Sequence, residues 1–253
     1  LDYTRPLPNG RLELGGKFRW RNIPTRITYT AAVGSPLDTG AAGGATYNEL
    51  IPALYANYVR EGERYELEAG LRMEFVDLAY TVDPGHNTYV SDGYSYLEPF
   101  PNVRYARVLG EASRLVVSLS RRVDRPDEGD LRIFPKYDDP GILRIGNPAL
   151  LPQFTWRGEL GYKRELSKGY VYVAAYHRMT SEILTRILTS DSTGTQLYSL
   201  AQNAGDGTNT GVELVAEHDE RVGRVADVAP VSGRAVAGLG VVGGRAVVHG
   251  ARA

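Results

Sequence analysis

The hydrophobic pattern of the chain repeats every two residues over long segments. From Tyr65 to Phe75 the sequence is YELEAGLRMEF, in which odd-numbered side chains are apolar and even-numbered residues are charged or glycine. A helix would mix these two sets, whereas a β-strand places them on opposite faces. Strands of soluble sandwiches usually have about 5–6 residues, whereas about 9–11 residues let a tilted strand cross a bilayer. These 11 residues therefore predict a transmembrane β-strand.

The same alternation recurs along most of the chain. The pattern predicts further strands at 11–21, 50–59, near 102–109, 114–122, 154–162, 170–176 and 207–217. In most of them one face is apolar, and the other carries Arg, Glu, Ser and Gly. An apolar face suits lipid, and a polar face suits a water-filled lumen. The pattern therefore predicts about eight strands of a membrane β-barrel in contact with outer-membrane lipid.

The connections between these segments alternate between short and long. Short polar turns are expected at 61–63, 110–113 and 166–169, and long links at 22–47, 81–98, 123–153 and 184–206. Compact soluble domains rarely contain structureless links of that length. Outer-membrane barrels combine short periplasmic turns with long extracellular loops. The predicted fold class is therefore all-β: an antiparallel transmembrane β-barrel segment, a partial barrel with short periplasmic turns and long extracellular loops.

Composition supports a location at a membrane surface. The chain has 17 tyrosines against 5 phenylalanines and 2 tryptophans, and tyrosine joins an apolar ring to a polar tip. Aromatic residues near the ends of predicted strands form the expected interfacial girdles: Trp20, Tyr65, Tyr80, Tyr162 and Tyr176. The net charge of −1 gives no attraction to nucleic acid. No uncharged apolar stretch is long enough for a transmembrane helix.

Several motifs in the middle of the chain resemble a known family. The matching pieces are Ser120-Arg121-Arg122 with Arg125-Pro126, Gly146-Asn147-Pro148 with Leu151-Pro152, the sequence ELGY at 159–162, the strand pair at 53–75 and the sequence GVEL at 211–214. Over about residues 10–218 the sequence resembles the C-terminal barrel of TonB-dependent outer-membrane receptors. It is most similar to the outer membrane protein beta-barrel family.

The resemblance implies a place in the outer membrane of a Gram-negative-type cell and a role in uptake. Such receptors are barrels of about 22 strands closed by a plug domain, and they import a scarce siderophore, cobalamin or glycan with energy delivered through TonB. About eight strands are only part of such a barrel. We therefore expect an interior piece of a receptor, with the TonB system and the plug as partners of the full-length protein.

The last part of the sequence differs in composition from the rest. No aromatic residue follows Tyr198, and from Asp219 onward the chain consists almost wholly of Val, Ala, Gly and Arg. The expected organisation is a partial barrel over 1–218 and a low-complexity tail over 219–253. One hypothesis is that the tail is read out of frame, and the alternative is a genuine flexible tail. The literal G-x-G-x-x-G at 238–243 lacks the acidic residue about 20 positions on that a dinucleotide site requires.

No arrangement in the sequence indicates catalysis, a metal or a cofactor. Cysteine is absent, and the four histidines are dispersed at His86, His177, His218 and His249. Neither a nucleophile–base pair nor a general-acid carboxylate pair can be argued from spacing, so the protein is expected not to be an enzyme. The acidic residues at 124–130 lie beside arginines, and we interpret them as a solvated loop.

If a small substrate binds, aromatic and arginine side chains on long loops and strand ends are the candidates. These residues are Tyr94, Tyr96, Arg121, Arg122, Arg125, Tyr137 and Arg144. Two other readings of the chain stay open. One is a small, complete eight-stranded outer-membrane barrel with a structural or adhesive role. The other is a soluble β-sandwich that binds glycans.

Overall fold

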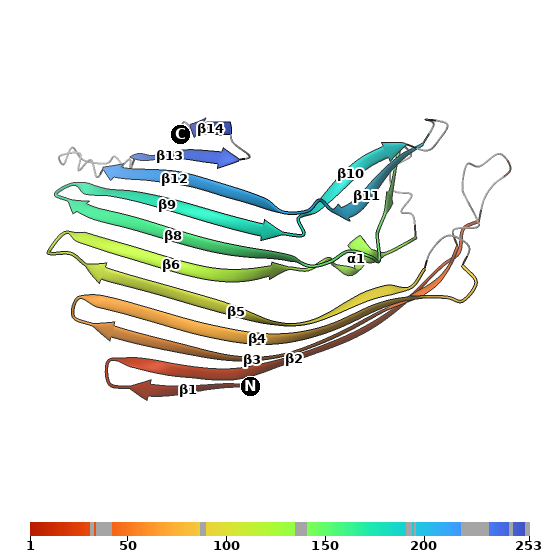
Figure 1. Ribbon diagram of the computed structural model, residues 1–253, viewed down its shortest axis with the longest axis horizontal. Helices are drawn as coiled ribbons and strands as arrows, with labels where there is room; N and C mark the ends of the chain where they lie inside the picture. The colour runs from red at the N-terminus through yellow and green to blue at the C-terminus, as the bar shows by residue number, and fades with distance from the viewer. Residues whose placement is uncertain are drawn as a thin grey trace, which may run out of the picture.

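The computed structural model describes residues 1–30, 33, 42–86, 90–134, 141–190, 194, 196–218, 233–242 and 245–250. These residues form an antiparallel sheet of 11 strands in the order β1-β2-β3-β4-β5-β6-β8-β9-β12-β13-β14, and a three-stranded sheet in the order β10-β11-β7 (Figure 1). Among them, no helix is long and apolar enough to cross a membrane.

The large sheet is built mainly from long strands that pair with their neighbours along the chain. They are β1 (Asp2–Leu7), β2 (Gly10–Ile27), β3 (Gly43–Gly62), β4 (Tyr65–Val82), β5 (Asp92–Val108), β6 (Ser113–Asp124), β8 (Gln153–Leu166), β9 (Gly169–Ser181), β12 (Gly207–His218), β13 (Gly233–Val242) and β14 (Arg245–Gly250). Eight of them have 12 or more residues: β2, β3, β4, β5, β6, β8, β9 and β12. The prediction of about eight long antiparallel strands is confirmed.

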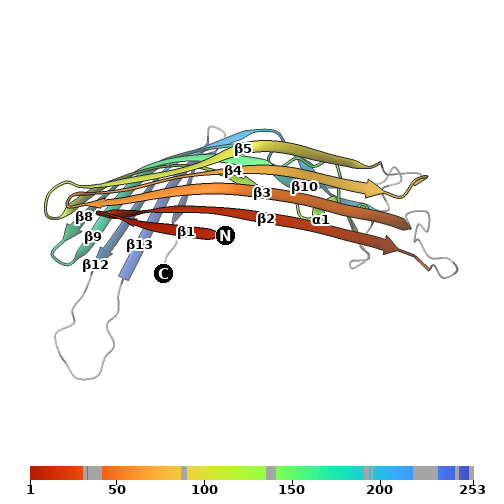
Figure 2. The same ribbon diagram turned by 90° about the horizontal axis from the view of Figure 1, so that it is seen from below.

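The two ends of the sheet differ as the sequence predicts. Tight turns lie at one end, and one of them places Asn9 at φ 60°, the left-handed backbone that a short hairpin requires. The long connections lie at the other, extracellular end (Figure 1). Figure 2 shows the sheet as a bowed wall, with α1 (Glu128–Leu131) beneath its arch. Within the described ranges no ladder joins β1 to β14, so the sheet is an open part of a barrel wall.

The outward face of the wall is apolar over a limited height. In β4 the residues from Tyr65 to Phe75 that point outward are apolar, and Met73 and Phe75 are exposed. Asp77 and Thr81 follow on the same face, and both are exposed. Ten residue steps cover roughly 33 Å of strand, which at a tilt of about 40° spans about 25 Å. That height matches the hydrocarbon layer of an outer membrane.

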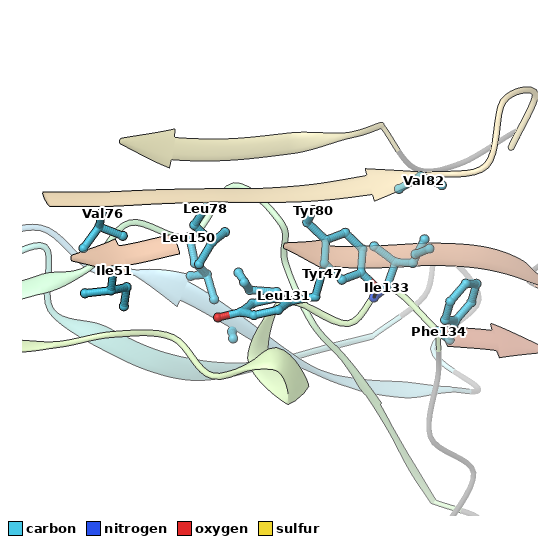
Figure 3. Close-up of a cluster of buried hydrophobic side chains, with 12 residues drawn as sticks. Tyr47, Ile51, Val76, Leu78, Tyr80, Val82, Leu131, Ile133, Phe134 and Leu150 are labelled. Atoms are coloured by element: carbon cyan, nitrogen blue, oxygen red, sulfur yellow. Dashed lines mark hydrogen bonds between the residues drawn. The ribbon is translucent and has the colours of Figure 1, made fainter. Parts of the chain in front are cut away.

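The hydrophobic core lies on the inner face, at the extracellular end of the wall. Its residues are Ala45, Tyr47, Ile51, Val76, Leu78, Tyr80, Val82, Leu131, Ile133, Phe134, Leu150 and Ala201 (Figure 3). Side chains of β3 and β4 supply one half of this core. The long connections after β6 and β9 supply the other half. Tyr80 is fully buried there and accepts a hydrogen bond from the Ile133 backbone N–H at 3.4 Å.

The structure corrects four expectations, three of them through this core. The links at 123–153 and 184–206 contain secondary structure, namely α1, β7 (Ile142–Ile145), β10 (Leu184–Ser190) and β11 (Leu197–Asn203). The inner face is apolar rather than polar near its extracellular end, because these segments fold back onto it and bury it. For the same reason Tyr80 belongs to the core and not to an interfacial girdle. Tyr176 also points inward, because it directly follows Ala175, which faces outward, and successive strand residues point to opposite faces.

The end of the chain continues the sheet through β13 and β14. Residues 219–232, 243–244 and 251–253 lie outside the described residues. The division into a barrel over 1–218 and a low-complexity tail over 219–253 therefore remains a prediction.

Candidate functional site on the inner face

A cluster of charged and tyrosine side chains lies along the inner face and overlaps the hydrophobic core, with which it shares Tyr47. We call it the inner-face network; it consists of Arg19, Arg21, Tyr47, Glu49, Arg72, Glu74, Tyr94, Tyr96, Glu98, Arg121 and Arg125. The antiparallel register brings its members together, since Arg21 lies opposite Glu49, and Glu74 lies opposite Glu98. Residues that are far apart in the sequence therefore share one layer of the wall.

Glu49 is the first anchor of the network. Glu49 is 2% exposed, so its negative charge needs compensation within the protein. Arg21 Nε donates to Glu49 Oε2 at 2.6 Å, and Arg19 Nη2 donates to Oε1 at 3.1 Å. Arg21 Nη2 also donates to the Tyr47 hydroxyl at 3.1 Å. Two guanidinium groups thus hold one buried carboxylate in place.

Glu74 is the second anchor, and it is 3% exposed. It forms ion pairs with Arg72 and Arg125. The Tyr96 hydroxyl donates to Glu74 Oε1 at 3.3 Å and accepts from Arg125 Nε at 2.8 Å. Arg125 follows β6, and burial lowers its pKa to about 10. Its guanidinium therefore stays charged at neutral pH and remains a partner for the carboxylate.

Arg121 reaches the network from the outward face of β6, where it lies opposite Trp156 and shares its face with exposed Leu119, and it connects the network to aromatic side chains. Its Nη1 donates to Glu98 Oε2 at 2.5 Å and to the Pro99 carbonyl at 3.0 Å. The guanidinium carbon lies 4.9 Å from the centre of the Phe154 ring and 5.7 Å from that of Trp156. Both distances are typical of cation–π contacts.

The network carries an excess of positive charge. Its five arginines outnumber its three glutamates, which leaves two positive charges in excess. The Tyr94 ring stacks on Tyr96 with a centroid distance of 6.1 Å. The Tyr94 hydroxyl is buried and has no hydrogen-bond partner among the described residues. The Tyr94 hydroxyl thus lies as a buried polar group beside the charged side chains.

The structure brings together four of the seven residues predicted from the sequence. Tyr94, Tyr96, Arg121 and Arg125 all belong to the inner-face network. Arg122 is exposed and makes no ion pair or hydrogen bond within the described part of the chain. Tyr137 lies outside the described residues.

Arg144, the seventh predicted residue, lies on β7 beside a separate polar pocket of about 270 Å³. Asp130 and Arg186, which also line the pocket, form an ion pair of 2.6 Å. Asp127 caps α1 by accepting from the Asp130 backbone N–H. The acidic loop therefore has local structural partners, as its interpretation from the sequence supposed.

Sequence reasoning missed most of the network. The missed residues are Arg19, Arg21, Tyr47, Glu49, Arg72, Glu74 and Glu98. Each strand shows its own alternating charges, but only the register between strands shows which charges meet. One usable signal is present in the sequence: Arg21 and Glu74 lie where the inner faces of β2 and β4 change from charged to apolar along the strand. Within the described residues, no group of three or more His, Asp or Glu side chains is placed to hold a metal ion.

Comparison with known proteins explains the architecture. The sequence model of the outer membrane protein beta-barrel family matches residues 1–219. The chain belongs to this family. The resemblance noted in the sequence is confirmed, and so is the location in the outer membrane. Family membership also excludes the soluble β-sandwich reading. No curated protein sequence matches the chain.

Several solved structures of outer-membrane proteins share the fold. The copper transporter OprC is 16% identical with a TM-score of 0.64, and the match covers 95% of this chain and 36% of OprC. The FrpB iron transporter of Neisseria meningitidis is 15% identical with a TM-score of 0.54, covering 95% and 34%. The hemophore receptor HasR of Serratia marcescens, in complex with its hemophore HasA and heme, is 13% identical with a TM-score of 0.55, covering 92% and 42%.

These identities show a common fold alone. The chain spans 34–42% of the length of these three proteins. An open wall of this size is therefore comparable to part of each of their barrels.

Proposed function

We propose that this family member forms part of the barrel wall of a TonB-dependent receptor that imports a scarce small substrate, such as a siderophore, cobalamin or glycan. The similar structures, described by their titles as copper and iron transporters and a hemophore receptor, support a role in uptake rather than catalysis. In the full-length protein the TonB system and a plug domain would be its partners.

The inner-face network is the observation that carries this proposal. One face of the wall is apolar and suits lipid, while the other presents arginine, glutamate and tyrosine side chains in a single layer. Its excess of arginine favours a substrate with carboxylate, phosphate or other anionic groups.

The seven residues predicted from the sequence differ in how accessible they are to a substrate. Arg122 and Arg144 are exposed and are available to a ligand at the extracellular side. Arg121 and Arg125 already contact carboxylates, so a substrate would compete with Glu98 and Glu74 for them. We propose contact roles for all seven, Tyr137 included.

Substrate uptake by cells that produce the full-length protein tests the proposal. We expect deletion of the gene to abolish growth on one scarce substrate supplied alone, and its return on a plasmid to restore growth. Replacing Arg72→Gln should reduce binding of that substrate about tenfold, because one charge-assisted hydrogen bond is lost. The matched control is Arg104→Gln, which affects an exposed ion pair with Glu66 in the periplasmic half. Normal growth of the deletion strain on siderophores, cobalamin and glycans alike would refute the proposal.

A further inference from the structure

The large sheet is interrupted between β5 and β6. β5 pairs with β4 along nearly its whole length, from Asp92 to Arg107. With β6 it pairs only over Asn102–Val108, opposite Arg114–Ser120. β6 continues to Asp124, but from Arg121 onward it pairs only with β8. In the extracellular half of the wall, β5 and β6 therefore diverge (Figure 1).

The sequence of β5 is suited to this interruption. Successive residues of a strand direct their backbone groups to opposite neighbours, and the odd-numbered Leu109 N–H donates to Ser113 at the start of β6. By this alternation Pro99 and Pro101 face the side of β6. Proline has no N–H, so neither residue leaves a donor unpaired where the ladder stops. The Pro99 carbonyl is satisfied by Arg121.

Two arginines bridge the interruption with their side chains. Arg121, on β6, binds Glu98 and the Pro99 carbonyl of β5, and its side chain is only 13% exposed. Arg125, four residues further on, forms an ion pair with Glu74 of β4 and donates to the Tyr96 hydroxyl of β5. Both contacts cross from the β6 side to the β4–β5 side.

Aromatic rings fill the same interruption. Phe154 of β8 meets the edge of Tyr96 of β5 at a centroid distance of 5.5 Å. It also stacks on Phe100 of β5 at 6.3 Å. The Arg121 guanidinium lies over the Phe154 ring. Side chains thus take the place that a backbone ladder occupies in the periplasmic half.

We propose that Arg121, Arg125 and Phe154 form a clasp that closes a built-in seam in the barrel wall. Opening the clasp lets the extracellular half of the β1–β5 sector move away from the β6–β12 sector, and the mouth of the lumen widens. This motion breaks a few side-chain contacts and leaves the ladder at Asn102–Val108 intact. A continuous ladder in lipid could not open in this way, since each unpaired backbone group would lose its partner without access to water.

A distance measurement by double electron–electron resonance on the full-length protein in detergent micelles, without any substrate, tests the clasp. This chain has no cysteine, so spin labels are placed by Ala79→Cys on β4 and Val123→Cys on β6, and a control pair by Leu67→Cys and Leu115→Cys. The variant Arg121→Met keeps an unbranched apolar side chain and removes the charge. We expect the population with a longer distance between the labels at Ala79 and Val123 to rise about tenfold, the factor that follows from loss of one charge-assisted hydrogen bond. The distance between the labels at Leu67 and Leu115, where the ladder between β5 and β6 is continuous, should stay unchanged. The matched control is Arg114→Met, which removes an ion pair with Glu66 where β5 and β6 are paired.

Equal distances between the labels at Ala79 and Val123 in Arg121→Met and in the protein with native Arg121 would overturn the proposal, as would an equal lengthening in the control pair at Leu67 and Leu115. If Arg121→Met does not fold, as judged by heat-dependent mobility in gels, Glu98→Gln and Phe154→Leu replace it. Glu98→Gln weakens the bridge and Phe154→Leu removes the ring. A longer distance confined to the labels at Ala79 and Val123 in either variant supports the clasp, and no lengthening in both refutes it.

Discussion

Docking of the extracellular connections onto the inner face should depend on a few buried side chains. Leu131 is completely buried in the core between the connection after β6 and the wall. Replacing a buried leucine with alanine costs about 2–5 kcal/mol, and the lower end of this range applies where a short segment can relax. A loss of about 2–3 kcal/mol corresponds to a roughly 30- to 150-fold larger undocked population.

Limited proteolysis of intact cells measures this population, because cleavage follows the open form when opening is fast. In Leu131→Ala we expect cleavage within 125–152 to accelerate by roughly 30- to 150-fold. The matched control is Leu97→Ala, the same truncation at an outward-facing residue that is 64% exposed. Heat-dependent mobility in gels checks that the barrel stays folded. If both variants are cleaved at the native rate, Leu131 does not hold the connection, and the assignment of this core is wrong.

Two further predictions concern the two faces of the wall. Glu49→Gln should lower the free energy of unfolding by about 1–2 kcal/mol, because charge-assisted hydrogen bonds from Arg19 and Arg21 are weakened while these side chains stay 37% and 40% exposed. Glu66→Gln at a 48% exposed side chain should change it by less than about 0.5 kcal/mol. Urea titration of the protein refolded into lipid vesicles measures both, and equal effects would contradict the burial argument. By the same titration, Leu71→Arg in the apolar belt should cost about 2–4 kcal/mol. Asp77→Arg, on the same face beyond the belt, should cost about 0–1 kcal/mol; comparable losses would show that the belt does not end at Phe75.

The sequence predicts the membrane-crossing half of the wall better than its extracellular half. Between Tyr65 and Phe75 a single environment acts on each face, lipid outside and water inside, so alternation alone identifies the strand. Beyond Phe75 the polarity of the two faces is inverted: Val76 and Leu78 point inward, and Asp77 points outward. The strand continues, but its pattern changes phase, so β4 is longer than the sequence indicates. The inward apolar residues are explained only by connections that arrive from much later in the chain.

The candidate site could be predicted only in part, for a related reason. Tyr94, Tyr96, Arg121 and Arg125 stand out in the sequence because they lie in or beside segments expected to be long polar links. The structure places Tyr94 and Tyr96 within β5 and Arg121 within β6, so the expected link at 81–98 is too long. Their carboxylate partners on β3, β4 and β5 belong to ordinary alternating strands, and no local sequence feature distinguishes them from other glutamates. Pairing across the interruption between β5 and β6 is a tertiary contact, and no local pattern predicts it.

The limit of the apolar belt and the inner-face network lie at the same height of the wall. On the outward face the last large apolar side chains before polar residues are Trp20 in β2 and Phe75 in β4. Arg21 and Glu74 are their direct chain neighbours and point inward. The charged layer therefore lies at the level of the extracellular membrane boundary, beneath the docked connections.

A substrate that enters from outside would meet this layer before the rest of the lumen. Given the uptake function proposed above, substitutions in the network should weaken capture of the substrate and not only its passage. In cells that lack TonB, we expect binding of labelled substrate to fall about tenfold in Arg72→Gln. The periplasmic control Arg104→Gln should bind normally, since its ion pair with Glu66 lies near the other end of β5. Unchanged binding in Arg72→Gln together with slower uptake in normal cells would place the role of the network in passage and refute a role in capture.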